Sequence, residues 1–444
     1  MLKQQTATRL DLVSEGLTKY HVKCLQATEG NLDTIIDFVL ASQTERNWRL
    51  NTKQSYIQTL SIFSKFHNNK PFNKIIRNDN ISFLNSFRRS EQEDPLHQWI
   101  GTYNLYNTHI TMFFKWFYNP QLELRDRPKP PCVKNIPQLP RMEQSIYKPE
   151  DMWSVEDDLL FLKYCPFLRD KCYHAISRDS SCRPHELLKL KIKDVNFKQI
   201  NGRLVAELQV NGKTGNRSIP LFNSIPHLKN WLDVHPQRNN PNSVLICSMG
   251  PGISHQIKSD AVGKIYERSK KYFEQLIDTK IDEEDKIKIK ELLKKHWNPY
   301  VRRHSAITEK AKMFNESIMR QHCGWTADSS MILKYTHYFG NESSTAILEG
   351  YGIKPKQEDV NKMKPKQCPN CDESNEINSK FCRKCRMVLS YDAYAQVNEE
   401  KDTVNDKIDV LQSQLRTIVS SLSLADQTTK NKMAKSMVES GLFK

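Results

Sequence analysis

The chain has 444 residues, of which 38% are hydrophobic and 27% charged, so it can bury a core and is expected to form two or three domains. Its formal net charge of +16 favours a polyanionic partner, because each lysine or arginine set against a phosphate releases counterions. The sequence contains no apolar run long enough to span a bilayer, and Met1–Gln5 lacks the apolar core of a signal peptide. These features argue against a membrane protein and predict a cytoplasmic one.

Residues 1–124 are predicted to form a small helical domain. Apolar side chains recur there at helical spacing in two stretches, at Tyr56, Leu60, Phe63 and Phe66 and then at Tyr106, Ile110, Phe113, Phe114 and Phe117. Two such amphipathic helices predict a bundle. Basic residues scattered through this region can face phosphates, although a solvated helical face explains each of them equally well.

A proline-dense stretch follows the helical region. Six of the twenty prolines lie between Arg125 and Pro149. Proline resists helix formation, and a run of prolines behaves as a semi-rigid extended spacer. We therefore expect a linker over residues 125–150 and a second domain over residues 151–355.

The second domain is predicted to be helical with one small sheet. Helical sequence from Ser154 to Tyr173 precedes a polar turn at Arg178–Ser181 and a helix over Pro184–Leu190, where proline suits the first turn. Alternation over Leu204–Val210, turn residues at Asn211–Asn216 and a second extended segment at Arg217–Leu221 predict a β-hairpin that presents Lys213 at its tip. Helical patterns then occupy Ser259–Ile277, Glu283–Lys295, Ser305–Lys312 and Ser330–Tyr338.

Four of the eleven cysteines form two Cys-x-x-Cys pairs separated by ten residues, namely Cys368, Cys371, Cys382 and Cys385. Such pairs can place four thiolates tetrahedrally around Zn²⁺. Four unrelated surface cysteines are a poorer explanation, since a segment of about thirty residues has little core without a metal. We expect a structural zinc ribbon over residues 364–392 and reduced thiols at the seven scattered cysteines.

Residues 393–444 are predicted to form a helical tail. Apolar residues recur at helical spacing along it, at Val404, Ile408, Leu411, Leu415, Ile418 and Leu422. This stripe is expected to dock on the same chain or on a second copy rather than on the polyanionic partner.

Several motifs in the second domain occur in the order and spacing of one enzyme family. They are Arg183 in Arg-x-x-Glu-Leu-x-x-Leu, Lys213 in Gly-Lys-Thr-Gly, Arg303-His304-Ser305, Gly324-Trp325 and Tyr335-Thr336-His337. Over roughly residues 150 to 345 the chain resembles the tyrosine recombinases, or phage integrases. The Gly-Trp pair ten residues before the tyrosine, together with the zinc ribbon, resembles the archaeal integrases of mobile elements in particular.

The resemblance implies a chemical role for each motif residue. Tyr335 would attack the scissile phosphate and form a 3′-phosphotyrosyl bond, so that religation needs no nucleotide cofactor. Arg183 and Arg303 would neutralise the charge that develops on the non-bridging oxygens. Lys213 would protonate the leaving 5′ oxygen from a mobile hairpin tip.

Three further residues would support this chemistry. Trp325 would donate its indole N–H to the phosphate, and Glu186 would orient the cluster. The family commonly has histidine three residues before the second arginine, where this chain has Tyr300. A phenol donates hydrogen bonds but is a poor base at neutral pH. The proton of Tyr335 would then pass to water or through His304, unless His304 is only a structural residue under the site.

The resemblance also implies an architecture and a set of partners. A helical core-binding domain and a catalytic domain would clamp double-stranded DNA, and strand exchange would involve a tetramer on DNA in the cytoplasmic nucleoid. Three alternatives stay open: a recombinase-derived DNA-binding protein that no longer cuts, a nicking-closing enzyme like the type IB topoisomerases, and an RNA-associated factor. The last leaves the motif set unexplained.

Overall fold

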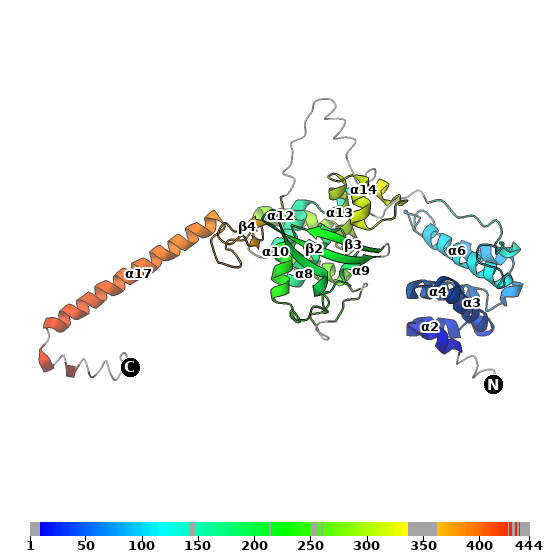
Figure 1. Cartoon of the computed structure of the whole chain (residues 1–444), viewed down its shortest axis with the longest axis horizontal. Helices are drawn as coiled ribbons and strands as arrows, with labels where there is room; N and C mark the ends of the chain where they lie inside the picture. The colour runs from blue at the N-terminus through cyan, green and yellow to red at the C-terminus, as the bar shows by residue number, and fades with distance from the viewer. Residues whose placement is uncertain are drawn as a thin grey trace, which may run out of the picture. The chain divides into compact units, whose positions relative to one another are not determined.

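The computed structural model describes residues 9–141, 147–212, 215–250, 255–258, 261–335 and 362–424, and a few residues beyond 424. It divides the chain into two units, residues 1–146 and 147–444 (Figure 1). Both are mainly helical, and the only sheets in these described ranges are small and antiparallel, as the sequence predicted. None of the described helices combines the length and the apolar character that crossing a membrane requires.

The first unit is a helical bundle with an aromatic core. Its main helices are α2 (Lys19–Gln26), α3 (Leu32–Arg46), α4 (Leu50–Phe66), α5 (Arg77–Asn85) and α6 (Trp99–Tyr118). Phe63 of α4 and both Phe113 and Phe114 of α6 are fully buried, as their helical spacing predicted. Phe66 differs from its predicted place in the core, since it is the last residue of α4 and is 42% exposed.

The proline-dense segment is not a free spacer over its whole length. Cys132 and Val133 are buried in the core of the first unit. The side-chain amide of Asn80 donates to the Cys132 carbonyl at 2.9 Å, and that of Asn104 donates to the Leu139 carbonyl at 2.8 Å. Backbone carbonyls left unpaired by the prolines thus find partners on α5 and α6. The segment up to Leu139 belongs to the first unit.

The second unit places a small sheet among helices. The described helices are α7 (Val155–Tyr164), α8 (Leu168–Ser180), α9 (Pro184–Leu187), α10 (Ile225–Asp233), α11 (Gly263–Leu276), α12 (Glu283–Lys294), α13 (Pro299–Ala311), α14 (Glu316–Cys323) and α15 (Met331–Leu333). The antiparallel sheet has the order β1 (Val195–Ile200), β2 (Arg203–Gly212) and β3 (Gly215–Leu221). Strand β1 was not predicted, because five of its six residues are exposed and it lacks the apolar alternation of a half-buried strand.

Three predicted boundaries need correction. The helical stretch from Ser154 is two helices, α7 and α8, interrupted around Pro166. The predicted polar turn at Arg178–Ser181 is helical through Ser180, and only Ser181, with φ of 51°, ends α8. The hairpin turn is tighter than expected, since Asn211 pairs with Asn216 and Gly212 with Gly215 in the β2–β3 ladder.

Arg178 forms no turn because it belongs to a buried ionic network. Asp158 on α7 is fully buried and accepts from the Arg178 guanidinium at 2.8 Å and contacts His174 Nε2 at 2.9 Å. Arg302 on α13 lies 2.9 Å from the same carboxylate, in an ion pair whose N–H groups are not aligned for a hydrogen bond. Burial opposes ionisation of Asp158, but the charge of Arg302 lowers its pKa below the ordinary value. This network ties α7, α8 and α13 together and fixes the helix that carries Arg303.

The C-terminal part consists of a small cysteine-bearing segment and one long helix. The segment contains the short strands β4 (Lys366–Gln367) and β5 (Ser374–Asn375), which pair antiparallel. Side chains from this segment dock on α10: Lys229 pairs with Glu373 at 2.6 Å, and Asn230 donates to Glu376 at 2.7 Å. The long helix that follows is α17 (Tyr391–Leu424), coloured orange in Figure 1.

Candidate active site and metal centre

Two guanidinium groups converge on the C-terminal end of α14. Arg183, which immediately precedes α9, donates to Glu186 Oε1 at 3.0 Å and to the Gly324 carbonyl at 3.4 Å. Arg303 on α13 donates to the Cys323 carbonyl at 3.3 Å. The two arginines predicted from their motifs are therefore brought together on consecutive carbonyl groups, although they are far apart in the sequence.

The charges at this place favour an anion. Burial lowers the pKa of Arg303, which is only 5% exposed, and the nearby positive charge of Arg183 lowers it further. The guanidinium of Arg217 lies beside these two. Among the described hydrogen bonds and ion pairs of the three arginines, the only carboxylate is that of Glu186. A surplus of fixed positive charge on partly buried side chains stabilises a bound anion such as a phosphate.

Tyr335 lies in the same cluster with its hydroxyl group shielded. It is 1% exposed, its hydroxyl oxygen lies 2.8 Å from His304 Nδ1, and its ring stacks on Trp325 with centroids 5.6 Å apart. Burial raises the pKa of Tyr335 well above its ordinary value, while the positive charges of Arg303 and Arg183 oppose the rise. The charges of both arginines therefore act on the phenol of Tyr335, the predicted nucleophile.

His304 is placed to accept a hydrogen bond from that hydroxyl. Burial lowers the pKa of His304 to about 4, and the charges of Lys334 and Arg303 act in the same direction. The imidazole is therefore neutral at pH 7, and with Nδ1 unprotonated it accepts a hydrogen bond from the Tyr335 hydroxyl. This tautomer is assigned from the hydrogen bond.

Arg217 is a site residue that the sequence reasoning missed. From β3 it donates to Glu186 Oε2 at 2.7 Å and to the His322 carbonyl at 3.2 Å. Burial alone would raise the pKa of Glu186, but the hydrogen bond and charge of Arg217 lower it to about 2. Arg217 therefore joins the hairpin, α9 and α14. The sequence did contain one indication that Arg217 points inward: alternation along β3 puts it on the same face as the buried Ile219 and Leu221.

Two glycines make room for this guanidinium. A Cβ atom on Gly212 would lie 2.7 Å from Glu186 Oε1 and 2.8 Å from Arg217 Nη1. A Cβ atom on Gly324 would lie 2.6 Å from Arg217 Nη1, and Gly324 also has φ of +64°. A side chain at Gly212 would displace the ends of Glu186 and Arg217, whereas Gly324 is favoured as glycine by its backbone conformation as well.

The remaining predicted residues are placed as follows. Lys213 lies outside the described residues; its neighbours Gly212 and Gly215 face each other at the end of the ladder. Tyr300 lies on the first turn of α13, one turn before His304, and is 50% exposed. Helix α13 begins at Pro299, six residues earlier than predicted, because Asn298 caps its first backbone N–H groups.

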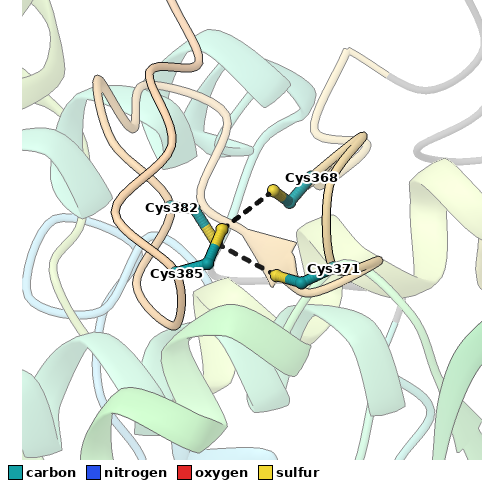
Figure 2. Close-up of side chains that lie close together, drawn as sticks. All are labelled: Cys368, Cys371, Cys382 and Cys385. Carbon is teal, nitrogen blue, oxygen red and sulfur yellow. Dashed lines mark hydrogen bonds between the residues drawn. The ribbon is translucent and has the colours of Figure 1, made fainter.

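The four cysteines of the C-terminal segment form a compact cluster (Figure 2). Their sulfur atoms all lie within 4.8 Å of one another, with Cys368 to Cys385 at 3.5 Å and Cys371 to Cys382 at 3.6 Å. Zinc held by four thiolates at about 2.3 Å needs sulfur atoms roughly 3.8 Å apart. The donor set and the spacing therefore fit one Zn²⁺ ion.

Each Cys-x-x-Cys pair lies in a turn of the same form. The backbone N–H of Asp372 donates to the Cys368 carbonyl at 2.9 Å, and that of Arg386 donates to the Cys382 carbonyl at 3.0 Å. Asp372 and Arg386 both have positive φ, of 54° and 63°. Two equivalent turns facing each other hold the sulfur atoms in place.

Removal of zinc is expected to unfold this segment without unfolding the rest of the second unit. Binding of structural zinc contributes on the order of 10 kcal/mol to such small domains. The Cys368→Ser, Cys382→Ser double variant should contain no zinc by elemental analysis, against one ion per chain in the parent, and should be cut by trypsin within residues 362–390. Cys24→Ser, at a cysteine outside the cluster, should keep the ion and resist cleavage. Equal zinc content in all three proteins would contradict the assignment.

Mild acid is expected to destabilise the second unit. Burial lowers the pKa of His227 and His304 to about 4 and that of His322 to about 3, against 6.5 for an ordinary histidine. The unfolded chain therefore binds more protons than the folded one between about pH 4 and 6.5, so stability falls as pH drops through that window. The loss is about 2 kcal/mol per histidine at pH 5.

Thermal unfolding checks this expectation. The midpoint should be lower at pH 5 than at pH 7.5, whereas carboxylates such as Glu186, whose pKa is about 2, contribute little in this range. His322→Gln should flatten the dependence. A midpoint that is the same or higher at pH 5 would show that these histidines are not buried in neutral form.

Comparison with known proteins gives one family match. Residues 159–342 match the phage integrase family. No curated protein sequence matches the chain. Similar solved structures include the XerH site-specific recombinase bound to palindromic difH substrate, at 18% identity and a TM-score of 0.49 over 76% of this chain and 89% of that chain. The integrase of transposon Tn1549 in complex with transposon right end DNA has 12% identity and a TM-score of 0.48, over 72% and 99% of the two chains. A lambda integrase dimer bound to a COC′ core site has 12% identity and a TM-score of 0.47, over 70% and 77%.

Proposed function

We propose, from the match of residues 159–342 to the phage integrase family, the tyrosine recombinases, that the chain is a site-specific DNA recombinase. It cleaves and rejoins DNA strands through a 3′-phosphotyrosyl intermediate on Tyr335. The observation that carries the proposal is the convergence of Arg183, Arg303 and the Tyr335 phenol around the end of α14. Two guanidiniums and a phenol are what transfer of a DNA phosphoryl group to a tyrosine requires.

The chemistry assigns a role to each group. Arg183 and Arg303 hold the non-bridging oxygens of the scissile phosphate, and their fixed charges stabilise the transition state. The Tyr335 oxygen forms a bond to phosphorus as the bond to the 5′ oxygen breaks. The phenol proton passes to His304, which is neutral and 2.8 Å away. Lys213 gives a proton to the leaving 5′ oxygen, and the reverse sequence religates the strand.

The DNA-free arrangement keeps the nucleophile covered. Tyr335 is 1% exposed and stacks against Trp325 and His304. A phosphate must reach this hydroxyl before the hydroxyl can react, so DNA binding and a local rearrangement that uncovers it precede cleavage. Trp325 then turns its indole N–H to the phosphate, and the half-exposed Tyr300 donates from the first turn of α13.

The remaining parts suit a protein that holds duplex DNA. The first unit is assigned as the core-binding domain, the second as the catalytic domain, and exchange between two duplexes involves a homotetramer. The net charge of +16 supports a polyanionic partner and a place in the cytoplasmic nucleoid. Zn²⁺ is assigned a structural role, because Arg383 of the ribbon contacts Asn230 and Glu373 rather than reaching away from the protein.

Covalent trapping on DNA tests the proposal. The full chain is incubated with genomic DNA of its source, quenched with detergent, and the DNA ends that stay attached to protein are sequenced. Ends that accumulate at one sequence are the expected result. Ends spread over all sequences would indicate a nicking-closing enzyme of the type IB kind, and retention of DNA binding without attached ends would indicate a binding protein that no longer cuts.

A further inference from the structure

A line of large apolar side chains lies exposed along α17. Val404, Ile408, Leu411 and Leu415 are between 44% and 63% exposed, and we call these four residues the α17 stripe. Soluble proteins seldom expose a contiguous row of this size unless it meets a partner. The part of the chain that the structure describes does not cover the stripe.

The spacing of the stripe is that of a coiled coil. Its members are separated by four, three and four residues, and Ile418 and Leu422 continue the alternation in the sequence. This is a seven-residue repeat with apolar residues at the first and fourth positions, which keeps one seam facing a partner helix along its length. A helix of 34 residues is about 50 Å long, enough for more than three such repeats.

The positions beside the stripe carry little charge. In the seven-residue repeat the flanking positions next to Leu411 and Leu415 are Gln412 and Gln414, and the next ones are Asn405, Lys407, Val419 and Ser421. Two copies that meet along the stripe therefore oppose almost no like charges. The acidic Asp406 and Asp409 fall at positions of the repeat that are away from the seam.

Charge also excludes DNA as the occupant. Between Tyr391 and Leu424 the helix has six acidic and three basic residues, in a chain whose net charge is +16. A helix with net negative charge repels a phosphate backbone. A self-complementary apolar seam with neutral flanks fits a second identical helix.

We propose that α17 pairs with α17 of a second copy of the chain along the α17 stripe. The contact joins two chains in the absence of DNA and does not depend on the proposed strand cleavage. It places two catalytic units in one particle before either meets a target site.

Molar mass measured by light scattering on the full, zinc-loaded chain without DNA tests this pairing. The parent should give twice the chain mass of 51.9 kDa at micromolar concentration. The Leu411→Lys, Leu415→Lys variant should dissociate, with a dimer dissociation constant raised roughly 100-fold or more. Ser413→Lys, Ser420→Lys adds the same charge on the opposite side of the helix and should remain dimeric.

Two results would overturn the proposal. One is a parent chain that stays monomeric up to about 50 µM, well above the dissociation constants usual for stable dimers. The other is a dimer that survives in the leucine variant, which would locate the association elsewhere. The thermal unfolding of the second unit, measured in parallel, should be the same in both lysine variants, so that a loss of mass is not a loss of fold.

Discussion

Replacement of Tyr335 by phenylalanine is expected to abolish covalent attachment to DNA while DNA binding is retained. The change removes one oxygen atom, the one that would bond to phosphorus, and leaves the ring stacked between His304 and Trp325. Because the Tyr335 oxygen is the proposed nucleophile, adduct formation should fall by at least roughly 10³-fold. Detergent-resistant adducts on labelled DNA are counted by gel electrophoresis, and binding is measured by mobility shift.

A matched variant separates the chemistry from the fold. Tyr272→Phe removes a hydroxyl group from a partly buried tyrosine on α11. It should form adducts at the rate of the parent. Adducts of parental amount in Tyr335→Phe would mean that another residue is the nucleophile.

The second large effect is expected at Arg183. Arg183→Gln removes a guanidinium that would bind the phosphate, and should slow adduct formation about 10²- to 10³-fold. The fold should survive, because Glu186 keeps its bonds to Arg217 and to the backbone N–H of residue 183. A single-turnover rate at saturating DNA measures the transition-state contribution apart from binding.

The control for this prediction is an arginine of equal charge away from the site. Arg238 is exposed, and its guanidinium donates to the Asp233 carbonyl. Arg238→Gln should change the rate by less than about twofold, because exposed charges contribute little. If both variants lose the same small factor, Arg183 acts only through the general charge of the surface.

Residue patterns predicted the helical bundle, the hairpin and the cysteine cluster, because each has a strong local signal. Burial of Phe63 and Phe113 follows from helical periodicity, and the four cysteines follow from their spacing. The strand β1 and the helical state of Arg178 could not be predicted in this way. The residues of β1 are mostly exposed, so they show no apolar alternation. Arg178 is polar but helical, because it pairs with the buried Asp158.

The order of the motifs predicted Arg183, Arg303 and Tyr335 as site residues. It did not predict which contacts hold them in place. Arg217 joins the hairpin to α9 and α14 through Glu186, a contact between positions 31 residues apart that no local pattern indicates. The helix start at Asn298-Pro299 did have a local signal, a capping residue followed by proline at the first turn. Contacts between residues that are far apart in the sequence depend on the fold, so local sequence patterns do not reveal them.

The burial of Tyr335 is the feature with the greatest functional consequence that the sequence did not predict. Periodicity places a tyrosine on a helix, but the closure of His304 and Trp325 over its ring follows from how α13 and α14 pack. Under the proposed function, this cover over Tyr335 restricts cleavage to the DNA-bound protein. Burial raises the pKa of this phenol further above its ordinary value of about 10, so the tyrosine stays neutral in the DNA-free protein.

The most direct measurement is the identity of the residue that carries DNA after trapping. The parent chain is quenched on DNA, digested with nuclease and trypsin, and the modified peptide is sequenced by mass spectrometry. We expect a nucleotide joined through its 3′ phosphate to Tyr335. A nucleotide on any other residue, or a 5′ linkage, would contradict it.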